Sequence, residues 1–287
     1  MDPLAWSGAE QSAIPGAVSA PTAPTVRLAR SVEHALRRLG TGFLFATFGI
    51  GSLIVACIVL PILALRERGA ARELAAQRLL HRSTAAFVRL GTALRLFELR
   101  ERGTERLSRN AGLVLATHPT LLDVVFLLSR MPQADCIVKA EAWRNPFLRP
   151  VVAAAGYVPN TGGTSVVEAC AARLRAGRAV IVFPEGTRSP ATDLGPFKRG
   201  AARIALRSGG DVTPVLIRCE PSALRKDQRW WDVPNAKLVF TLDVGSPLSV
   251  AALAGDALGR GPALAARAFN RALLDHFEAR AADAGVR

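Results

Sequence analysis

The sequence of 287 residues is poor in cysteine, lysine and aromatic residues, and each shortage narrows the possible functions. Its four cysteines show no Cys-x-x-Cys spacing, which argues against a disulfide framework or a structural zinc site. Aromatic residues make up only 6% of the chain, so the base-stacking side chains of a nucleic-acid-binding module are scarce. General disorder is excluded as well, because 50% of the residues are hydrophobic. The chain therefore has enough apolar content for a sizeable core.

Acidic residues are also outnumbered, 23 against 37 basic ones, which gives the chain a formal net charge of +14. Only four of the basic residues are lysines, so nearly all of the positive charge is arginine. A basic surface can serve nucleic acid, an anionic membrane or an acidic ligand, and composition alone does not choose among the three.

The N-terminal part of the chain divides into a polar stretch and a long apolar one. Residues 1–26 are rich in Ala, Pro, Ser and Gly and lack a basic residue, so we expect residues 1–40 to form a disordered, then basic, tail. Residues 41–65 carry no charge over 25 positions, and roughly 20 helical residues cross a hydrocarbon core ~30 Å thick. We therefore expect a membrane-anchoring helical segment. It either spans the bilayer or, because it contains Gly49, Gly51 and Pro61, bends back as a re-entrant element.

The stretch from about 70 to 98 has the pattern of an amphipathic helix. Three arginines, at positions 78, 82 and 89, share one face, and apolar residues such as Phe87 and Leu90 gather on the other. The basic face is typical of a helix on an anionic bilayer, whereas the apolar stripe is equally typical of a helix packed on a neighbouring domain. Residues 41–106 are thus predicted to form a membrane segment and an amphipathic helix.

Residues 107–287 are predicted to form one α/β domain with a mainly parallel sheet flanked by helices. Short runs rich in Val, Ile and Leu alternate there with helical patterns, which is typical of βαβ units. The expected strands are 112–117, 136–139, 179–183, 213–218 and 237–244, and the expected helices are 121–130, 164–176, 198–208 and 263–282.

His118 directly follows the expected strand 112–117, and Asp123 falls at the start of the next helix. In an open α/β sheet, ligands bind in the crevice at the carboxyl ends of the strands. A carboxylate there can accept a hydrogen bond from one imidazole nitrogen and leave the other as a base. No Gly-x-Ser-x-Gly nucleophile elbow occurs in the chain, so such a pair would activate a hydroxyl group of the substrate. The alternative is a structural histidine with an ordinary hydrogen bond.

A second polar constellation, Phe183–Ser189 (FPEGTRS), follows another expected strand. Pro184 and Gly186 bend the chain, Glu185 brings a carboxylate, and the planar cation of Arg188 suits bidentate recognition of phosphate. An ordinary turn with a surface Glu–Arg pair is the alternative. Both constellations would lie at strand ends of one sheet, and this shared location favours a common site.

The blocks His118–Asp123 (HPTLLD) and Phe183–Ser189 together resemble the lysophospholipid acyltransferase family, typified by 1-acylglycerol-3-phosphate acyltransferases. The similarity extends over roughly residues 110–220 and includes VKAEAWRNP, the segment that contains Lys139. It implies an α/β acyltransferase domain that transfers a fatty acyl group from acyl carrier protein or coenzyme A. It also implies that neither a metal nor a further cofactor is needed.

The resemblance also implies roles for individual residues. His118 would remove the proton from the acceptor hydroxyl, and Asp123 would orient His118. Substrate binding would fall to Glu185, Gly186 and Thr187, which shape the acceptor site, to Arg188, which contacts a phosphate, and to Lys139. An apolar groove or tunnel for the acyl chain is implied as well.

One departure from the family pattern concerns the acceptor. Phosphatidate-forming members usually have an Arg after the block that here reads Gly156–Asn160 (GYVPN), whereas the next basic residue in this chain is Arg173. Arg188, Lys139, Lys198 or Arg199 would then have to supply the cation, or the acceptor is another lipid.

We therefore expect a membrane-anchored O-acyltransferase that acylates a lysophospholipid such as 1-acylglycerol-3-phosphate in phospholipid biosynthesis. Its partners would be membrane lipids, the acceptor and the acyl carrier protein or acyl-CoA donor, without nucleic acid. Its expected location is a bacterial inner membrane, with the catalytic domain on the cytoplasmic face. The alternatives are an acyltransferase for a non-phosphatidate lipid in a specialised bacterial lipid or polyene pathway, a thioesterase or lipase, and a basic membrane-surface binding protein without catalysis.

Overall fold

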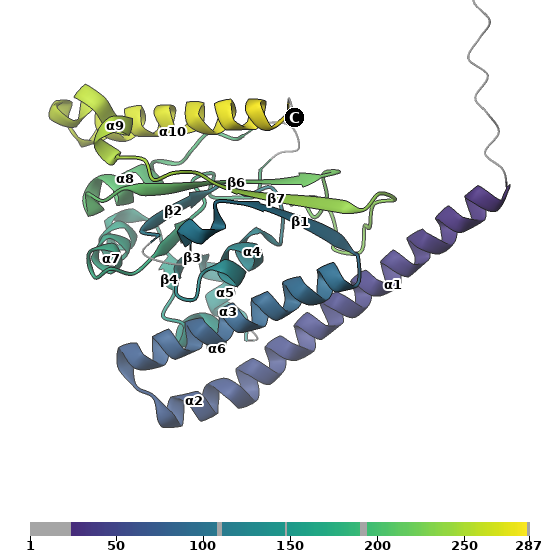
Figure 1. The fold of residues 1–287 in the computed structure, drawn as a ribbon. Coiled ribbons are helices and arrows are strands. Elements are labelled where there is room, and N and C mark those ends of the chain that lie inside the picture. Colours follow the sequence, from purple (N-terminus) through teal and green to yellow (C-terminus); the bar gives the residue numbers. More distant parts are fainter. Residues whose placement is uncertain (1–23, 108–110, 147, 190–193, 286–287) are drawn as a thin grey trace, which may run out of the picture.

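The computed structural model describes residues 24–107, 111–146, 148–189 and 194–285, and its centre is a seven-stranded sheet (Figure 1). The strand order is β1-β7-β6-β2-β5-β3-β4, and every neighbouring pair is parallel except β6 and β7. The strands are β1 (Phe97–Arg102), β2 (Leu113–Ala116), β3 (Asp135–Lys139), β4 (Val158–Asn160), β5 (Val180–Val182), β6 (Val212–Glu220) and β7 (Leu238–Val244). The predicted fold class, a mainly parallel α/β sheet flanked by helices, is confirmed.

Helices cover both faces of this sheet and form a long N-terminal hairpin. They are α1 (Pro24–Ile54), the π-helical turn η1 (Val55–Val59), α2 (Leu60–Arg66), α3 (Gly69–Ala93), the 3-10 helix η2 (Thr104–Leu107), α4 (Asp123–Arg130), α5 (Ala140–Arg144), α6 (Arg149–Ala154), α7 (Gly163–Arg175), α8 (Arg199–Ser208), α9 (Val250–Ala254), the 3-10 helix η3 (Gly255–Arg260) and α10 (Pro262–Gly285). The five expected strands and four expected helices of the domain are all present.

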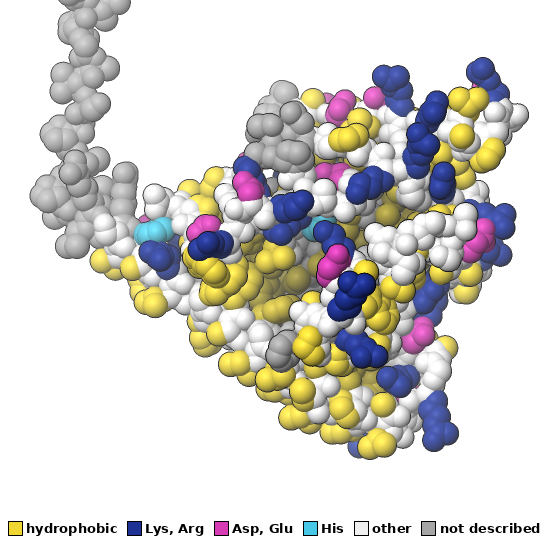
Figure 2. All heavy atoms as spheres, turned by 180° about the vertical axis from the view of Figure 1, so that it is seen from behind, with side chains coloured by type: hydrophobic (Ala, Val, Ile, Leu, Met, Phe, Trp, Pro, Cys, Tyr) yellow, Lys and Arg dark blue, Asp and Glu magenta, His cyan; other side chains and the backbone are white. Residues whose placement is uncertain are grey.

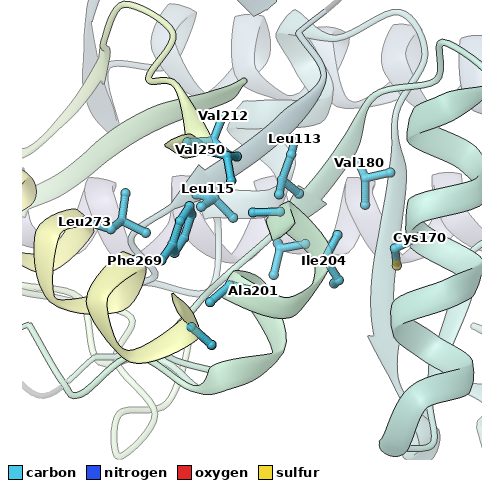
Figure 3. Packing of buried hydrophobic residues seen from close by; sticks show 14 of the residues in the cluster. Leu113, Leu115, Cys170, Val180, Ala201, Ile204, Val212, Val250, Phe269 and Leu273 are labelled. Carbon is cyan, nitrogen blue, oxygen red and sulfur yellow. The ribbon is translucent and has the colours of Figure 1, made fainter. Parts of the chain in front are cut away.

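The alternation of side chains along β2 shows how the two faces are filled. Leu113 and Leu115 pack with α7, α8, α9 and α10 (Figure 3), whereas Val114 and Ala116 pack with residues of α4 and α6. All four side chains are at most 1% exposed, because the strand is covered on both faces. In Figure 1, α10 lies on one side of the sheet and the α1–α3 hairpin on the other.

The predicted tail of residues 1–40 is wrong over its second half, since α1 begins at Pro24; residues 1–23 lie outside the described ranges. The stretch after residue 26 is rich in Arg, Leu and Ala, which are strong helix formers, and Glu33 pairs with Arg37 one turn later. The Ala-, Pro- and Ser-rich composition of the first residues does not extend into this stretch.

One helical run, Ser31–Arg66, is long and apolar enough to cross a membrane by length and composition, with a mean hydropathy of 2.6 over an 18-residue window. Only 11% of that window is buried. Leu44, Ala56 and Leu60 face the rest of the protein, whereas Ile50 is 61% and Leu65 86% exposed. The run therefore contacts the folded domain along one side and exposes a continuous apolar surface along the other.

The predicted amphipathic helix is α3, which ends at Ala93, so that Phe97 belongs to β1 instead. Phe87 and Val88 are buried in a cluster with residues of α4, and Arg78, Arg82 and Arg89 are exposed. Of the two interpretations of the apolar stripe, packing on the domain is confirmed. Because β1 pairs with β7, the sheet begins before the predicted boundary at residue 107.

A buried ionic cluster fastens α3 to the sheet. The carboxylate of Asp135, at the start of β3, is 0% exposed and lies 2.7 Å from Arg178 and 3.3 Å from Arg173. Gln77 of α3 donates a hydrogen bond to the same carboxylate, at 3.1 Å, and Glu73 of α3 pairs with Arg178 at 2.7 Å. Three segments far apart in the sequence thus share one set of charges. We call these five residues the Asp135 cluster.

Candidate functional site

His118 and Asp123 lie together at the carboxyl end of β2, which is the central strand of the sheet. Nδ1 of His118 is 2.8 Å from Oδ2 of Asp123, the first residue of α4. The Asp123 carboxylate also accepts hydrogen bonds from the backbone N–H of Thr120 at 2.7 Å and from its hydroxyl at 2.5 Å. The carboxylate is therefore fixed in position, and Nε2 is the ring nitrogen of His118 that remains for a ligand.

Burial and hydrogen bonding act in opposite directions on Asp123. Its side chain is 0% exposed, and this desolvation raises the pKa of its carboxyl group, while the hydrogen bonds from His118 and Thr120 lower that pKa. An ionised Asp123 accepts a hydrogen bond from the Nδ1–H of His118 and leaves Nε2 as an acceptor. In this tautomer the pair can act as a general base.

The strand-end loop of β5 holds the His118 ring and backbone from the other side. The Phe183 ring stacks on the imidazole, with centroids 4.1 Å apart and an interplanar angle of 23°. Glu185 accepts a hydrogen bond from the backbone N–H of His118 at 2.9 Å, and Ser189 donates one to the His118 carbonyl at 2.8 Å. The Glu185 side chain is only 4% exposed, and its hydrogen bond connects the loop after β5 to the loop after β2.

Gly186 has a backbone conformation that favours glycine, and the Lys198 side chain lies close against it. Its φ is +69°, and a Cβ atom there would come within 2.7 Å of the Lys198 side chain. The backbone N–H of Lys198 donates to the Pro184 carbonyl at 2.7 Å. Its ammonium is exposed and has no acidic partner among the described residues.

Arg188 is held by the backbone of a distant loop. Its Nη1 donates hydrogen bonds to the carbonyl oxygens of Leu224 at 3.0 Å and Arg225 at 2.8 Å. The surface Glu–Arg pair that was the alternative interpretation of this block does not form, because Glu185 contacts His118 instead. Part of the guanidinium's donor capacity is thus used within the protein.

A cavity of about 1170 Å³ opens beside His118. Most of its wall is apolar and comes from α1, α3, α4, β3 and α6, while five basic side chains line it, namely Lys139, Arg188, Lys198, Arg203 and Lys226. Figure 2 shows a hollow with an apolar floor and basic side chains around it. Such a combination suits a ligand with a long apolar part and an anionic or polar head.

The structure brings most of the predicted site residues to this cavity. His118, Lys139, Gly186, Thr187 and Arg188 all line it. The two remaining predictions, Asp123 and Glu185, are buried behind His118 and contact it. Among the described residues, no group of three or more His, Cys, Asp or Glu side chains is placed to hold a metal ion.

Three contributors to the site were not predicted from the sequence. Thr120 binds both oxygens of Asp123, Phe183 stacks on His118, and the carbonyls of Leu224 and Arg225 hold Arg188. Thr120 could have been found, because a hydroxyl three residues before an Asp at a helix start is in reach of its carboxylate. The other two contacts depend on the packing of distant segments.

Comparison with known proteins gives a consistent family. Residues 98–218 match the family model described as Acyltransferase. The 1-acyl-sn-glycerol-3-phosphate acyltransferase of Helicobacter pylori is 31% identical over 114 residues, which are 37% of this chain and 48% of that protein. The protein of the same name from Pseudomonas aeruginosa is 26% identical over 178 residues, which are 60% of this chain and 64% of that protein. The resemblance inferred from the two sequence blocks is confirmed.

A solved structure confirms the fold. The crystal structure of the 1-acyl-sn-glycerophosphate acyltransferase from Thermotoga maritima matches with a TM-score of 0.54 at 19% sequence identity. The match covers 85% of this chain and 96% of that one. Among curated relatives, however, this chain spans only 48% of the Helicobacter pylori protein and 31% of a chloroplastic relative from Brassica napus.

Proposed function

We propose that this chain, whose residues 98–218 form a domain of the acyltransferase family, transfers a fatty acyl group from an acyl thioester to a lysophospholipid hydroxyl. The observation that carries this proposal is the His118–Asp123 pair at the mouth of a large, mostly apolar cavity with a basic rim. The names of these relatives support 1-acylglycerol-3-phosphate as the acceptor and a role in phospholipid biosynthesis.

In the proposed mechanism, Nε2 of His118 takes the proton of the acceptor hydroxyl as its oxygen attacks the thioester carbonyl. Asp123, hydrogen-bonded to Nδ1 at 2.8 Å, stabilises the imidazolium that forms. The tetrahedral intermediate then collapses, the carbon–sulfur bond breaks, and the thiolate takes the proton from His118. The products are the ester and the free thiol of acyl carrier protein or coenzyme A, and no acyl-enzyme forms.

Different parts of the cavity would bind different parts of the substrates. Its apolar wall would hold the acyl chain, and Lys139 and Arg188, with Lys198, would hold phosphate at its rim. Arg188 already donates to two carbonyls, whereas Lys198 has no hydrogen bond from its ammonium to a described residue and keeps all three of its donors for a phosphate. Lys198 thus takes the place of the Arg missing after Gly156–Asn160.

The apolar face of Ser31–Arg66 supports membrane attachment of the enzyme. We place it at a bacterial inner membrane with the α/β domain on the cytoplasmic side, where acyl thioesters are made. An acceptor other than lysophosphatidate, from a specialised lipid or polyene pathway, is the second candidate, because the cation after Gly156–Asn160 is missing.

The test is product analysis with purified, detergent-solubilised protein, labelled acyl thioesters and a panel of lysolipids with and without phosphate. The expected result is an acylated lysophosphatidate. Rapid release of free fatty acid without an acceptor would instead indicate a thioesterase. If only acceptors without phosphate reacted, the second candidate would replace the first.

Lys198→Gln is expected to raise KM for a phosphate-bearing acceptor by about tenfold with little change in kcat, because one charged hydrogen bond is lost. Arg199→Gln is the matched control, since Arg199 is the exposed neighbour and does not line the cavity. Equal KM values for the two variants, measured by initial rates over a range of acceptor concentrations, would exclude the role of Lys198.

A further inference from the structure

The connection between β6 and β7, residues 221–237, carries two exposed tryptophans beside the apolar helix. Trp230 is 39% and Trp231 46% exposed, and their rings are 5.2 Å apart. Large aromatic side chains of this kind are usually buried, and pairs left at a surface mark contact sites. Neither ring lines the cavity, so substrate binding does not account for them.

The loop is anchored on α1 at a specific level. The Trp230 ring packs on Phe45 with centroids 5.1 Å apart, and the Arg37 guanidinium donates a hydrogen bond to the Asn235 carbonyl. Phe45 lies near the start of the uncharged run 41–65, and Arg37 lies in the basic stretch before it. The two tryptophans therefore stand where the polar part of α1 gives way to its apolar part.

This level is where tryptophan is enriched in membrane proteins, because its apolar ring and polar N–H suit the boundary between headgroups and hydrocarbon. The charge around the rings fits the same partner. The guanidinium of Arg229 lies over the Trp231 ring at 5.4 Å, and the loop carries four basic against two acidic side chains. An anionic lipid surface is thus complementary to both the rings and their surroundings.

The loop also reaches the candidate site. The carbonyl of Leu224 accepts hydrogen bonds from Arg188 at 3.0 Å and from the backbone N–H of Leu121 at 3.0 Å, and Lys226 lines the cavity. Leu224 has a φ of +56°, an unusual conformation for a leucine that its surroundings must hold in place. One short loop therefore contacts α1, Arg188 and the rim of the cavity.

We propose that residues 221–237 form a second membrane-contacting element, in which Trp231 inserts at the headgroup level of an anionic bilayer and so sets the cavity rim against the lipid surface. The proposal rests on the membrane attachment in the proposed function. A lipid acceptor embedded in the bilayer would then meet Lys226 and Arg188 as it leaves the lipid. A soluble acceptor would gain nothing from the insertion.

The first experiment uses the full chain with Trp6, Trp143 and Trp230 replaced by phenylalanine, so that Trp231 is the single fluorophore. On vesicles of phosphatidylglycerol and phosphatidylethanolamine, lipids brominated near the headgroup end of the acyl chain are expected to quench it more than lipids brominated near the chain end. Unquenched fluorescence from vesicle-bound protein would overturn the proposal, and so would a failure to bind the vesicles at all.

The second experiment compares Trp231→Ser with Leu264→Ser. Leu264 is 42% exposed and belongs to α10, which lies on the side of the sheet opposite the α1–α3 hairpin (Figure 1). Its replacement by serine therefore also removes an exposed apolar side chain. Trp231→Ser is expected to weaken vesicle binding at least about fivefold and to raise KM for a vesicle-embedded acceptor, while Leu264→Ser does neither. Equal behaviour of the two variants would overturn the proposal. Turnover of a monomeric short-chain acceptor in detergent tests the acyl transfer itself, and it should survive in both.

Discussion

Replacing His118 by alanine is expected to lower the rate of acyl transfer by about a thousandfold or more. General base catalysis contributes typically 10²–10⁴-fold. Among the described residues that line the cavity, no other is a histidine, and the His118 ring has an orienting carboxylate at 2.8 Å. The substitution removes the proposed base and leaves the cavity and its rim in place. Initial rates of thiol release with saturating donor and acceptor measure the effect.

A second variant, Asp123→Asn, tests the other member of the pair. The amide keeps the size of the buried side chain but cannot stabilise an imidazolium, so kcat should fall by a large factor while the substrates still bind. Both variants should have a melting temperature within a few degrees of that of the unchanged protein. Their affinity for vesicles should stay within about a factor of two. Undiminished turnover by well-folded His118→Ala would exclude the role that we assign to this residue.

Asp135→Asn is expected to lower the free energy of unfolding by about 3 kcal/mol. The substitution leaves the guanidinium groups of Arg173 and Arg178 without the charge that compensates them, and removing one partner of a buried pair costs about 3–5 kcal/mol. The lower end applies because the two arginine side chains are 24% and 23% exposed. Urea unfolding of the detergent-solubilised protein, followed by circular dichroism, gives the value.

The matched control for Asp135 is Glu168→Gln, which breaks a pair with Arg207 on the surface. Its partners are 49% and 60% exposed, so the expected cost is at most about 1 kcal/mol. If both substitutions lowered the free energy of unfolding equally, the Asp135 cluster would not be what holds α3 on the sheet. The larger effect should also appear as earlier proteolysis of α3, because Gln77 loses the charged partner in β3 and Arg178, which pairs with Glu73, loses its second carboxylate.

Two of the predicted strands, β2 and β5, differ in their position in the sheet from the two strands that were missed, β1 and β4. β2 and β5 are covered on both faces and consist almost entirely of branched apolar residues, which is a strong signal. β1, which reads FELRER, and β4 lie at the two edges of the sheet, and the charged side chains of β1 are partly or fully exposed. An edge strand that pairs with β7 across more than a hundred residues leaves no local pattern to detect.

The candidate site shows the same division. His118 and Asp123 are five residues apart, so the strand–helix turn that joins them could be predicted, and the HPTLLD block carried the resemblance. The contacts of Arg188 and Lys198 could not, because they depend on where the β6–β7 loop and the start of α8 settle against the β5 loop. Contacts between residues of one strand–helix turn can be predicted from the sequence. Which cation is held by the protein and which is left for a ligand depends on the tertiary structure.

The hairpin of α1, α2 and α3 has a practical consequence for anyone who shortens this protein to make it easier to handle. Thr47, Phe48 and Val55 of the apolar run are part of the cavity wall, facing α3 and α4. A truncated protein that starts at α3 would keep the sheet and the His118–Asp123 pair, yet its pocket would stand open to water along one side. The apolar segment is therefore also part of the cavity wall, and detergent is a safer remedy than deletion.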